Sequence, residues 1–396
     1  MSQTREVAVV GIHEYPLRVA PGVSALQIKA ESASKALADA GLSWKDVDAV
    51  YDNGQNQNIG GLSISEYFGF KPRLIDVTSV GGTSYEFQAH HAATMIAAGK
   101  ANVAILTYGS TAHSGRVAIG TAGATGQGAP TPFNNMEDSW GMTGIAGYGM
   151  VKARHMHQYG TTNEQFAEIS VATRYHAMRN PDAVKAMTDL EFVGVNEISV
   201  QDVVESRMIA WPLHLLECCM VSDGGGAVVI ASKEVAKNCK KKPVWIIGGG
   251  EATKYRENGG DITVSAGAQS GPVAFEDAGV TPSEIDALMA YDSFSITVML
   301  MIEDLGFCKK GEGGDYVSSE ILKFDQKGGP ALNTDGGGLS SNHPGERGIF
   351  CILEATRQMR GESTSQVDNA KLAVAVGNGG QLGARHATSP IILAAD

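Results

Sequence analysis

The chain has 396 residues, of which 43% are hydrophobic, 19% are charged and 49 are glycine, and its formal net charge at pH 7 is −12. This composition can bury a large core, so it excludes a disordered protein, and the negative charge makes nucleic acid a poor partner. No apolar run reaches the roughly 18 residues of a membrane span, and residues 1–6 lack a signal-peptide core, so we expect a cytoplasmic protein without membrane contact.

A repeat is the first pattern along the chain. The segment DAGLSWKDVDAV at 39–50 returns as DAGVTPSEIDAL at 277–288. In each copy a helix is predicted to end at a glycine, Gly41 or Gly279, before a short turn and an apolar strand. The repeat therefore predicts two halves built on one plan.

The resemblance between the halves continues downstream. A helix of small residues, Ala89–Ile96, precedes the strand Val103–Tyr108 in the first half. A helix through Leu353–Met359 precedes the strand Leu372–Val376 in the second half. Helices and strands that alternate in this way predict a layered α/β fold.

The two predicted domains differ in length. The N-terminal half takes residues 1–242, the C-terminal half takes 243–396, and Lys240–Pro243 is the predicted connector. The first half is longer because of a predicted loop insertion at about 110–215, rich in glycine, methionine and aromatic residues. Long excursions of this kind cover active sites or bind ligands, and a dimer contact is an equally good interpretation.

The cysteines and histidines do not predict a metal site. The five cysteines are odd in number and lack a CxxC spacing, so we expect reduced thiols rather than disulfides or a zinc knuckle. The pairs His90-His91 and His155-x-His157 diverge on a helix, and no carboxylate or cysteine set stands at ligand spacing beside them. We therefore expect no metal.

Four segments carry a family resemblance. They are PLHLLECCMVSDGGGA at 212–227, YDSF at 291–294, GGLSSNHPG at 337–345 and GNGG at 377–380. In this order, on a duplicated chain with a long first half, they resemble the motifs of the thiolase superfamily, of the sterol-carrier-protein type. The resemblance covers nearly the whole chain and implies a duplicated thiolase fold with α-β-α-β-α layers.

The departures from that family concern its catalytic groups. The family's nucleophilic cysteine is absent from the first-half turn, which reads GGTS at 81–84, and its acid/base cysteine is replaced by Gly377. Tyr291 stands where the family has histidine or asparagine, whereas the histidine of the His-Pro motif is kept as His343. A covalent acyl-enzyme is therefore not expected.

The resemblance implies catalytic roles for His343, Tyr291 and Asn342. The ordinary pKa of an imidazole near neutrality suits His343 to deprotonate a thiol or to donate to an oxyanion. Tyr291 is expected to donate a hydrogen bond, and to act as a base only if its pKa is strongly perturbed. Backbone N–H groups of two glycine turns are expected to stabilise thioester and enolate oxygens; these glycines are Gly81, Gly82, Gly379 and Gly380.

Three further residues are candidates for substrate binding. Arg385 and His386 follow the last glycine turn closely enough to reach the same cavity. Arg385 or Arg347 could pair with a substrate carboxylate through two hydrogen bonds. A surface or structural role is the alternative for each of them.

The first functional hypothesis is an acyltransferase that needs no cysteine. Coenzyme A, bound as a co-substrate and not covalently, attacks the ketone of a β-ketoacyl-CoA in a thiolytic, retro-Claisen cleavage. Within the family, the chain is most similar to the thiolase-fold subunits of 2-benzoylsuccinyl-CoA thiolases from anaerobic toluene degradation. This similarity implies benzoyl-CoA and succinyl-CoA as products.

Two alternatives remain. The chain also resembles steroid side-chain aldolases, which lack both cysteines and would cleave a β-hydroxyacyl-CoA without free CoA. Those aldolases have a second tyrosine where this chain has Asn342-His343. The other alternative is a non-catalytic scaffold subunit, against which stand His343 and the retained glycine turns.

The resemblance also implies partners. Thiolase-fold subunits of this branch work as homodimers with a small subunit that carries a zinc ribbon and an OB-fold. We therefore expect a dimer of this chain with such a partner attached.

Overall fold

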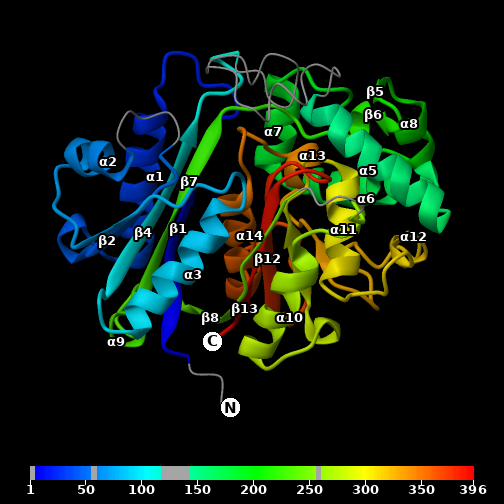
Figure 1. The fold of residues 1–396 in the computed structure, drawn as a ribbon. Coiled ribbons are helices and arrows are strands. Elements are labelled where there is room, and N and C mark those ends of the chain that lie inside the picture. Colours follow the sequence, from blue (N-terminus) through cyan, green and yellow to red (C-terminus); the bar gives the residue numbers. More distant parts are fainter. Residues whose placement is uncertain (1–4, 55–59, 117–142, 256–259) are drawn as a thin grey trace.

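The computed structural model describes residues 5–54, 60–116, 143–255 and 260–396. Its strands form two copies of one arrangement (Figure 1). The first half contributes β1 (Val7–Glu14), β2 (Ala49–Tyr51), β3 (Leu74–Asp76), β4 (Val103–Ser110) and β7 (Gly224–Ser232). The second half contributes β8 (Val244–Gly249), β10 (Ala287–Ala290), β11 (Ala331–Leu332), β12 (Leu372–Gly380) and β13 (His386–Ala394).

The strand order repeats as well. It is β3-β2-β4-β7-β1 in the first half and β11-β10-β12-β13-β8 in the second, so strands of the same rank occupy the same place. The two half-sheets meet edge to edge where β1 pairs with β8, at Ala8 with Trp245 and Val9 with Val244. A short strand, β9 (Ala252–Lys254), pairs with β13.

Helices form the remaining layers. α1 (Ala25–Ala40) covers the outer face of the first half, and α10 (Gly267–Ala278) covers the outer face of the second. Between the half-sheets lie α3 (Ser84–Ala97) and α14 (Gly348–Arg360), and each contacts strands of both halves. This arrangement confirms the predicted α-β-α-β-α layers.

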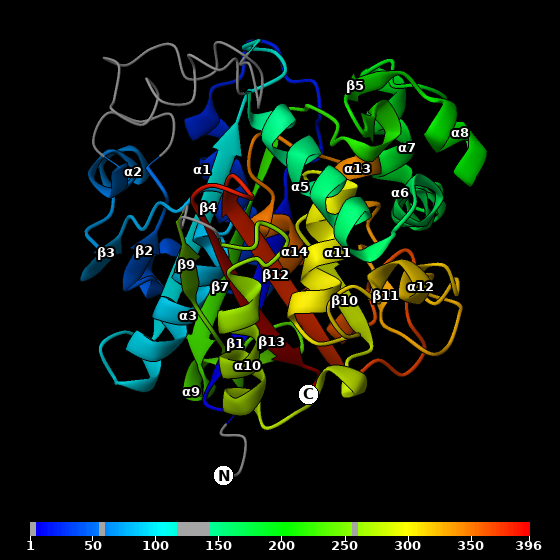
Figure 2. The same cartoon turned by 45° about the vertical axis from the view of Figure 1, so that its right-hand side comes forward.

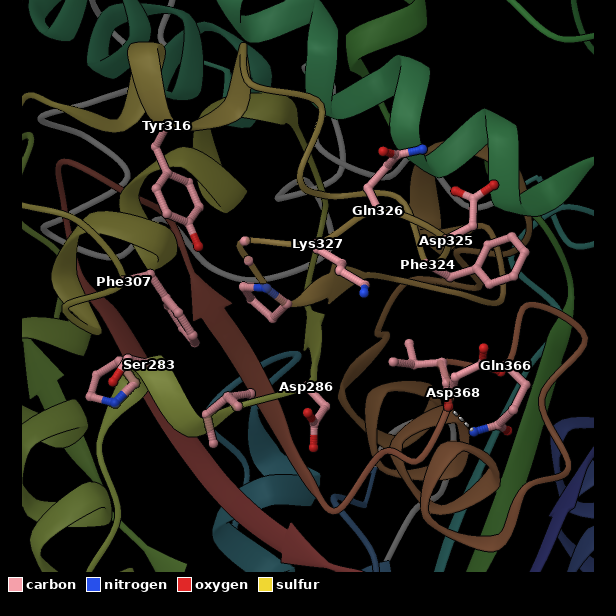
Figure 3. A pocket seen from close by; sticks show the side chains of 16 residues that line it. Ser283, Asp286, Phe307, Tyr316, Phe324, Asp325, Gln326, Lys327, Gln366 and Asp368 are labelled. Carbon is pink, nitrogen blue, oxygen red and sulfur yellow. Dashed lines mark hydrogen bonds between the residues drawn. The ribbon is translucent and has the colours of Figure 1, made fainter.

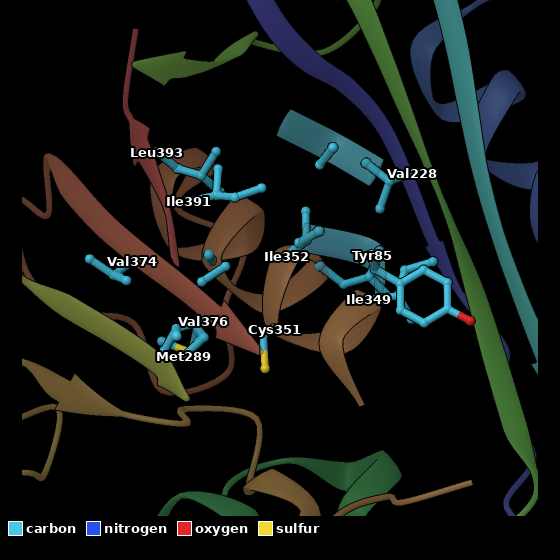
Figure 4. Packing of buried hydrophobic residues seen from close by; sticks show 14 of the residues in the cluster. Tyr85, Val228, Met289, Ile349, Cys351, Ile352, Val374, Val376, Ile391 and Leu393 are labelled. Carbon is cyan, nitrogen blue, oxygen red and sulfur yellow. The ribbon is translucent and has the colours of Figure 1, made fainter. Parts of the chain in front are cut away.

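The core surrounds the middle layer. Ile349 and Ile352 of α14 pack among Val376 of β12, Ile391 of β13 and Val228 of β7, all at most 1% exposed (Figure 4). Strands β12 and β13 are buried along almost their whole length, because helices cover both of their faces. This explains why Leu372–Val376 of β12 and Pro390–Ala394 of β13 are continuous apolar runs rather than alternating ones.

The repeated segments fold as predicted. α1 ends at Gly41, with a φ of 75°, and α10 ends at Gly279, with a φ of 66°. These left-handed conformations suit glycine, which has no Cβ. One turn of 3-10 helix, Trp44–Asp46 or Pro282–Glu284, then leads into β2 or β10.

The long segment in the first half is mostly helical where it is described, and the expected loop is wrong there. Its residues 117–142 lie outside the described residues. Its elements are α5 (Gly144–Tyr159), α6 (Asn163–Ala177), α7 (Pro181–Asp189), α8 (Val200–Glu205), β5 (Met208–Ala210) and β6 (Leu213–His214). Each of the four helices begins after a side-chain cap, respectively Thr143, Thr162, Asn180 and Ser199.

This segment packs on the second half although it belongs to the first. α5 and α6 lie beside α11 (Ser295–Asp304), and α6 also contacts α12 (Gly313–Val317) and α13 (Gly337–Ser340) (Figure 2). The remaining helices are α2 (Gly60–Phe68), α9 (Lys233–Ala236) and a 3-10 turn at Leu215–Glu217. Within the described ranges, no helix combines the length and apolarity needed to cross a bilayer.

Candidate active site

Tyr291 and His343 form the centre of the candidate site. Tyr291 directly follows β10, and its backbone N–H donates to the carbonyl of Val376 in β12. His343 lies in the loop between α13 and α14, where its N–H donates to the hydroxyl of Ser222 at 3.1 Å. The Tyr291 Oη lies 2.8 Å from His343 Nε2. Both side chains are buried, so this contact is sheltered from water.

Burial sets the protonation states of this pair. It raises the pKa of Tyr291 well above its usual value, and the nearby Cys219 and Glu346 side chains act in the same direction. It lowers the pKa of His343 to about 4, with Arg347 adding to the effect. The expected near-neutral pKa of His343 is therefore wrong. At pH 7 the site holds a neutral tyrosine and a neutral imidazole, a hydrogen-bond donor beside a proton acceptor.

The predicted glycine turns meet at this pair. A Cβ on Gly82 would lie less than 3.0 Å from the Tyr291 ring and from the carbonyl oxygen of Asn378. Gly81 has a φ of 76°, and a Cβ there would lie 2.7 Å from the backbone nitrogen of Gly380 and 2.9 Å from Cα of Gly379. Side chains would thus push the turn away from Tyr291, which explains the glycines at these positions.

Asn342 and Arg347 belong to a buried polar network. Asn342 donates to Glu14 at 2.8 Å and accepts from Arg347 at 2.7 Å. The Arg347 guanidinium donates two hydrogen bonds to Asp335, at 2.8 and 2.7 Å, and lies 3.1 Å from Asp292. The side chain is 1% exposed. The expectation that Arg347 binds a substrate carboxylate is contradicted, because two carboxylates of the protein already surround it.

Asp292 shows what this network does for the site. Its carboxylate accepts the backbone N–H groups of Gly338 and Leu339, at 2.7 and 3.2 Å. These residues begin the segment that leads to His343. Arg347 and Asp292 together tie the end of β10 to that segment, so they position Tyr291 and His343 relative to each other.

His386 and Arg385 lie at the beginning of β13, beside the last glycine turn. His386 is buried, accepts the N–H of Ala266 at 2.9 Å, and has a pKa lowered to about 4 by its burial. Arg385 is exposed, and its backbone carbonyl accepts from Gln381. Of the three candidates for substrate binding, Arg385 is the one whose side chain is exposed.

Two residues of the site, Tyr148 and Asn378, were not predicted from the sequence. The Tyr148 hydroxyl, from α5, donates to the carbonyl of Gly380 at 3.1 Å and accepts from Asn378 at 3.1 Å. The Tyr148 ring packs on Phe294, with centroids 4.5 Å apart. Asn378 stands inside the GNGG motif and could have been singled out there, whereas nothing in the sequence around Tyr148 indicates its role.

The cysteines do not supply a nucleophile here. All five are free, as predicted. Cys219 is close enough to Tyr291 to interact with it electrostatically, but burial raises its pKa well above the usual value. Burial also raises the pKa of Cys218 to about 12. Both thiols are therefore protonated at neutral pH and are poor nucleophiles.

The histidines of α3 differ from their predicted geometry. His90 and His91 were expected to diverge, yet both contact Glu251, at 2.7 and 3.3 Å, and His91 also contacts Asp76 at 2.7 Å. These carboxylates raise the pKa of His91 to about 10. Among the described residues, no group of three or more histidine, cysteine or carboxylate side chains is arranged so that it could hold a metal ion.

A separate cavity of about 580 Å³ lies at the opposite end of β10 (Figure 3). Asp286, which precedes β10, lines it together with Phe307, Tyr316 and Lys327. Tyr291 follows β10 and is not part of its lining. This cavity is therefore distinct from the candidate active site.

Comparison with known proteins agrees with this architecture. The family model for the thiolase C-terminal domain matches residues 248–393. The chain is 31% identical to an acetyl-CoA acetyltransferase of Methanothermobacter thermautotrophicus, over 95% of this chain and 97% of the relative. It is 31% identical to a steroid side-chain-cleaving aldolase of Thermomonospora curvata, over 98% of both chains.

Two further relatives are informative. Benzoylsuccinyl-CoA thiolase subunit BbsB of Thauera aromatica is 33% identical, over 79% of this chain and 78% of the relative. The solved structure of the Ltp2-ChsH2(DUF35) aldolase superposes with a TM-score of 0.86 at 28% identity, over 99% of this chain and 98% of the other. The protein belongs to the thiolase superfamily. Sterol carrier protein 2 of Oryctolagus cuniculus is a further relative, 32% identical over 57% of this chain and 41% of the relative.

Proposed function

We propose that the protein is an acyltransferase that cleaves a β-ketoacyl-CoA with free coenzyme A and without a cysteine nucleophile. The observation that carries the proposal is the 2.8 Å contact between a neutral tyrosine and a neutral histidine, Tyr291 and His343, against two glycine turns. The relatives support the class, because they include acyl-CoA transferases and lyases of the same fold.

The chemistry follows from the two protonation states. His343, neutral at pH 7, takes the proton of the CoA thiol, and the thiolate beside it then stabilises the imidazolium. Tyr291 keeps its proton and donates a hydrogen bond to the ketone oxygen as negative charge develops there. The thiolate attacks the ketone carbon, the carbon–carbon bond breaks, and an acyl-CoA enolate leaves.

We propose 2-benzoylsuccinyl-CoA as the substrate, with benzoyl-CoA and succinyl-CoA as products of anaerobic toluene degradation. The support is the similarity to benzoylsuccinyl-CoA thiolase subunit BbsB. This substrate carries a free carboxylate, and the exposed Arg385 beside the last glycine turn is the cation proposed to receive it.

A second candidate is a retro-aldolase that cleaves a β-hydroxyacyl-CoA. It is favoured by the steroid side-chain-cleaving aldolase among the relatives and by the solved aldolase with a TM-score of 0.86. The same tyrosine and histidine could then deprotonate the β-hydroxyl group. Against it, the chain has Asn342 beside His343 rather than a second tyrosine.

We also propose that the active form is a homodimer that carries a small zinc-ribbon and OB-fold subunit. The solved aldolase is named as a complex with a DUF35 protein, which supports a partner of that kind. Co-expression tests this: the chain should be inert alone and active with the partner, and full activity of the isolated chain would contradict it.

The deciding experiment follows product thioesters from 2-benzoylsuccinyl-CoA, with and without free CoA. Thiolysis predicts two thioesters, formed only when CoA is present, with intersecting initial-rate lines for the two substrates. Release of a carbonyl compound from a β-hydroxyacyl-CoA in the absence of CoA, without turnover of 2-benzoylsuccinyl-CoA, would establish the aldolase instead.

A further inference from the structure

The middle layer holds a buried carboxyl group, that of Glu86, which takes no part in the proposed cleavage by His343 and Tyr291. Glu86 lies in the first turn of α3 and is fully buried. Within the part of the chain that the structure describes, neither its carboxyl oxygens nor the buried hydroxyl of Thr83, just before α3, makes a hydrogen bond of good geometry, although the Thr83 hydroxyl and the Glu86 backbone N–H lie near enough to interact with the carboxyl group. Buried polar groups are nearly always paired, so an exception of this kind calls for an explanation.

The position of the Glu86 carboxyl group offers an explanation for its burial. A Cβ on Gly377 would lie less than 3.0 Å from Glu86 Oε2 and 2.5 Å from Thr83 Oγ1. A Cβ on Gly348 would also lie less than 3.0 Å from Glu86 Oε2. The carboxyl group therefore takes the space into which a side chain at position 377 would project. Position 377 is where the family resemblance places an acid/base cysteine, which this chain lacks.

The surroundings keep Glu86 protonated. Burial raises its pKa well above the usual value, and the carboxyl of Glu346 acts in the same direction, whereas the Thr83 hydroxyl opposes the shift. Cys351 of α14 also interacts with Glu86, and burial keeps that thiol neutral. Burial thus favours the protonated form of Glu86, a carboxylic acid that has a proton to give.

We propose that Glu86 returns the proton to the α-carbon of the departing acyl-CoA, in place of the side chain that position 377 lacks. This inference rests on the proposed function and requires the α-carbon to lie beside Gly377. The CoA thiol gives its proton to His343, the carbon–sulfur bond forms and the carbon–carbon bond breaks. The electron pair of that bond becomes the enolate, which takes the proton of Glu86. The proton held by His343 then passes to Glu86, so no proton is gained or lost.

The test uses the Glu86→Gln variant in the complex with its partner, with two measurements. One is thiolysis of 2-benzoylsuccinyl-CoA. The other is deuterium uptake from D₂O into the α-carbon of succinyl-CoA, which needs no attacking thiol because it is the reverse of the last two steps: Glu86 gives its proton to His343, its carboxylate removes an α-proton, and the exchanged acid returns a deuteron. Both rates should fall by about 100-fold or more, the usual contribution of a positioned acid. The matched control is Glu354→Gln, which removes another buried carboxyl of the middle layer, one already bonded by Thr334 and Ser363. It should stay within about threefold of the wild-type rate, since that carboxyl lies in no proposed proton path.

The outcomes separate this inference from the proposed function. A wild-type enzyme that cleaves while Glu86→Gln keeps both rates overturns the inference alone. A wild-type enzyme that does not cleave overturns the proposed function, and deuterium uptake then decides on Glu86 by itself. If Glu86→Gln does not fold, infrared spectra of the Glu354→Gln protein at pH 9 test the inference, because that protein keeps Glu86 and lacks the other buried carboxyl group of the middle layer. They must contain the carbonyl band of a protonated carboxylic acid that shifts when succinyl-CoA binds, and its absence overturns the inference.

Discussion

The two halves of the molecule share a strand order but not the chemistry at their strand ends. After β2 in the first half, Asp52 pairs with Lys29 at 2.9 Å and accepts from Thr107 at 2.8 Å, all three fully buried. After β10 in the second half, Tyr291 faces His343. The duplication thus supplies two equivalent strand ends. One holds fixed charges that stabilise the protein, and the other holds neutral groups that can exchange protons.

The largest expected effect comes from the loss of the Tyr291 hydroxyl. Tyr291→Phe should lower kcat of CoA-dependent cleavage by roughly 10²–10⁴-fold, because the hydroxyl that polarises the ketone is lost. Tyr85→Phe is the matched control: its hydroxyl donates to Glu346 at 3.2 Å and belongs to the first half. Activity of that control should change only a few-fold. Equal losses in both variants would contradict the division between the halves.

The next effect concerns stability. Lys29→Met should lower the free energy of unfolding by about 3–5 kcal/mol, because it leaves the Asp52 carboxylate buried without its counter-ion. Urea denaturation measures this loss. The double variant with Asp52→Asn should recover part of it, since no unpaired charge remains. A Lys29→Met protein as stable as wild type would show that the ion pair does not hold the first half together.

Substitution of Gly82 tests whether this first-half turn helps to position Tyr291 in the active site. Gly82→Ala should cost about 1–3 kcal/mol of stability and reduce activity, since its methyl group would displace the Tyr291 ring. Gly99→Ala, at a position with a φ of 70° and open space around it, should lose stability without losing activity. Parallel measurements of unfolding and kcat in the two variants separate packing from chemistry.

The buried histidines and the partly exposed His91 should change the pH dependence of stability in opposite directions. Burial lowers the pKa of His343, His176 and His386 to about 4, so the unfolded chain binds protons that the folded chain does not as the pH falls from about 6.5 to 4. Unfolding at pH 5 should be easier than at pH 7, by roughly 2 kcal/mol for each such histidine. His386→Gln should reduce this slope. An unchanged slope would contradict the buried, neutral state.

His91 of the first half has the reverse sign. Its pKa is raised to about 10 by Asp76 and Glu251, so the stabilisation is fully present below pH 6.5 and is lost as the pH rises through 10. Because the ring is 35% exposed, solvent screens much of this effect. His91→Gln should therefore flatten the alkaline side of the stability profile, and also weaken the loss of stability in acid, where Asp76 and Glu251 take up the protons that His91 helps to keep off.

The smallest expected effect is at Arg385. Arg385→Ala should raise KM about tenfold for a substrate with a free carboxylate, the loss of one partly exposed ion pair, and leave kcat nearly unchanged. An acetoacetyl-CoA substrate, which has no carboxylate, is the control and should show no change. A loss that is equal for both substrates would argue for a structural role of this arginine.

Much of the fold could be predicted because a repeat specifies local structure twice. The glycines that end α1 and α10, the turns after them and the strands that follow all agree between the copies. The ordered motifs likewise indicated that Tyr291, His343 and the glycine turns would meet. These residues are far apart in the sequence, but each motif has a fixed place in the duplicated fold, so their order along the chain was enough to predict the contact.

Other parts of the site depend on tertiary contacts that no local pattern encodes. Because Arg347 comes just after the His-Pro motif, the sequence suggested that it binds a substrate carboxylate. Its structural role is visible only from its ion pairs with Asp292 and Asp335. The pKa of His343 depends on its burial. Tyr148 comes from a helix without a motif, and Glu86 lies just beyond the GGTS turn, where no motif marks it. Both reach the site because α5 and α3 pack there.

The sharing of α3 and α14 between both half-sheets has a consequence for how the protein unfolds. The first half contributes α3 to the middle layer and the second half contributes α14, and strands of both halves pack on each helix. A fragment that holds one half would therefore expose a broad apolar face to solvent. The two copies of the repeat are therefore a single cooperative unit, and splitting the chain between residues 242 and 243 should give fragments that fold only when mixed.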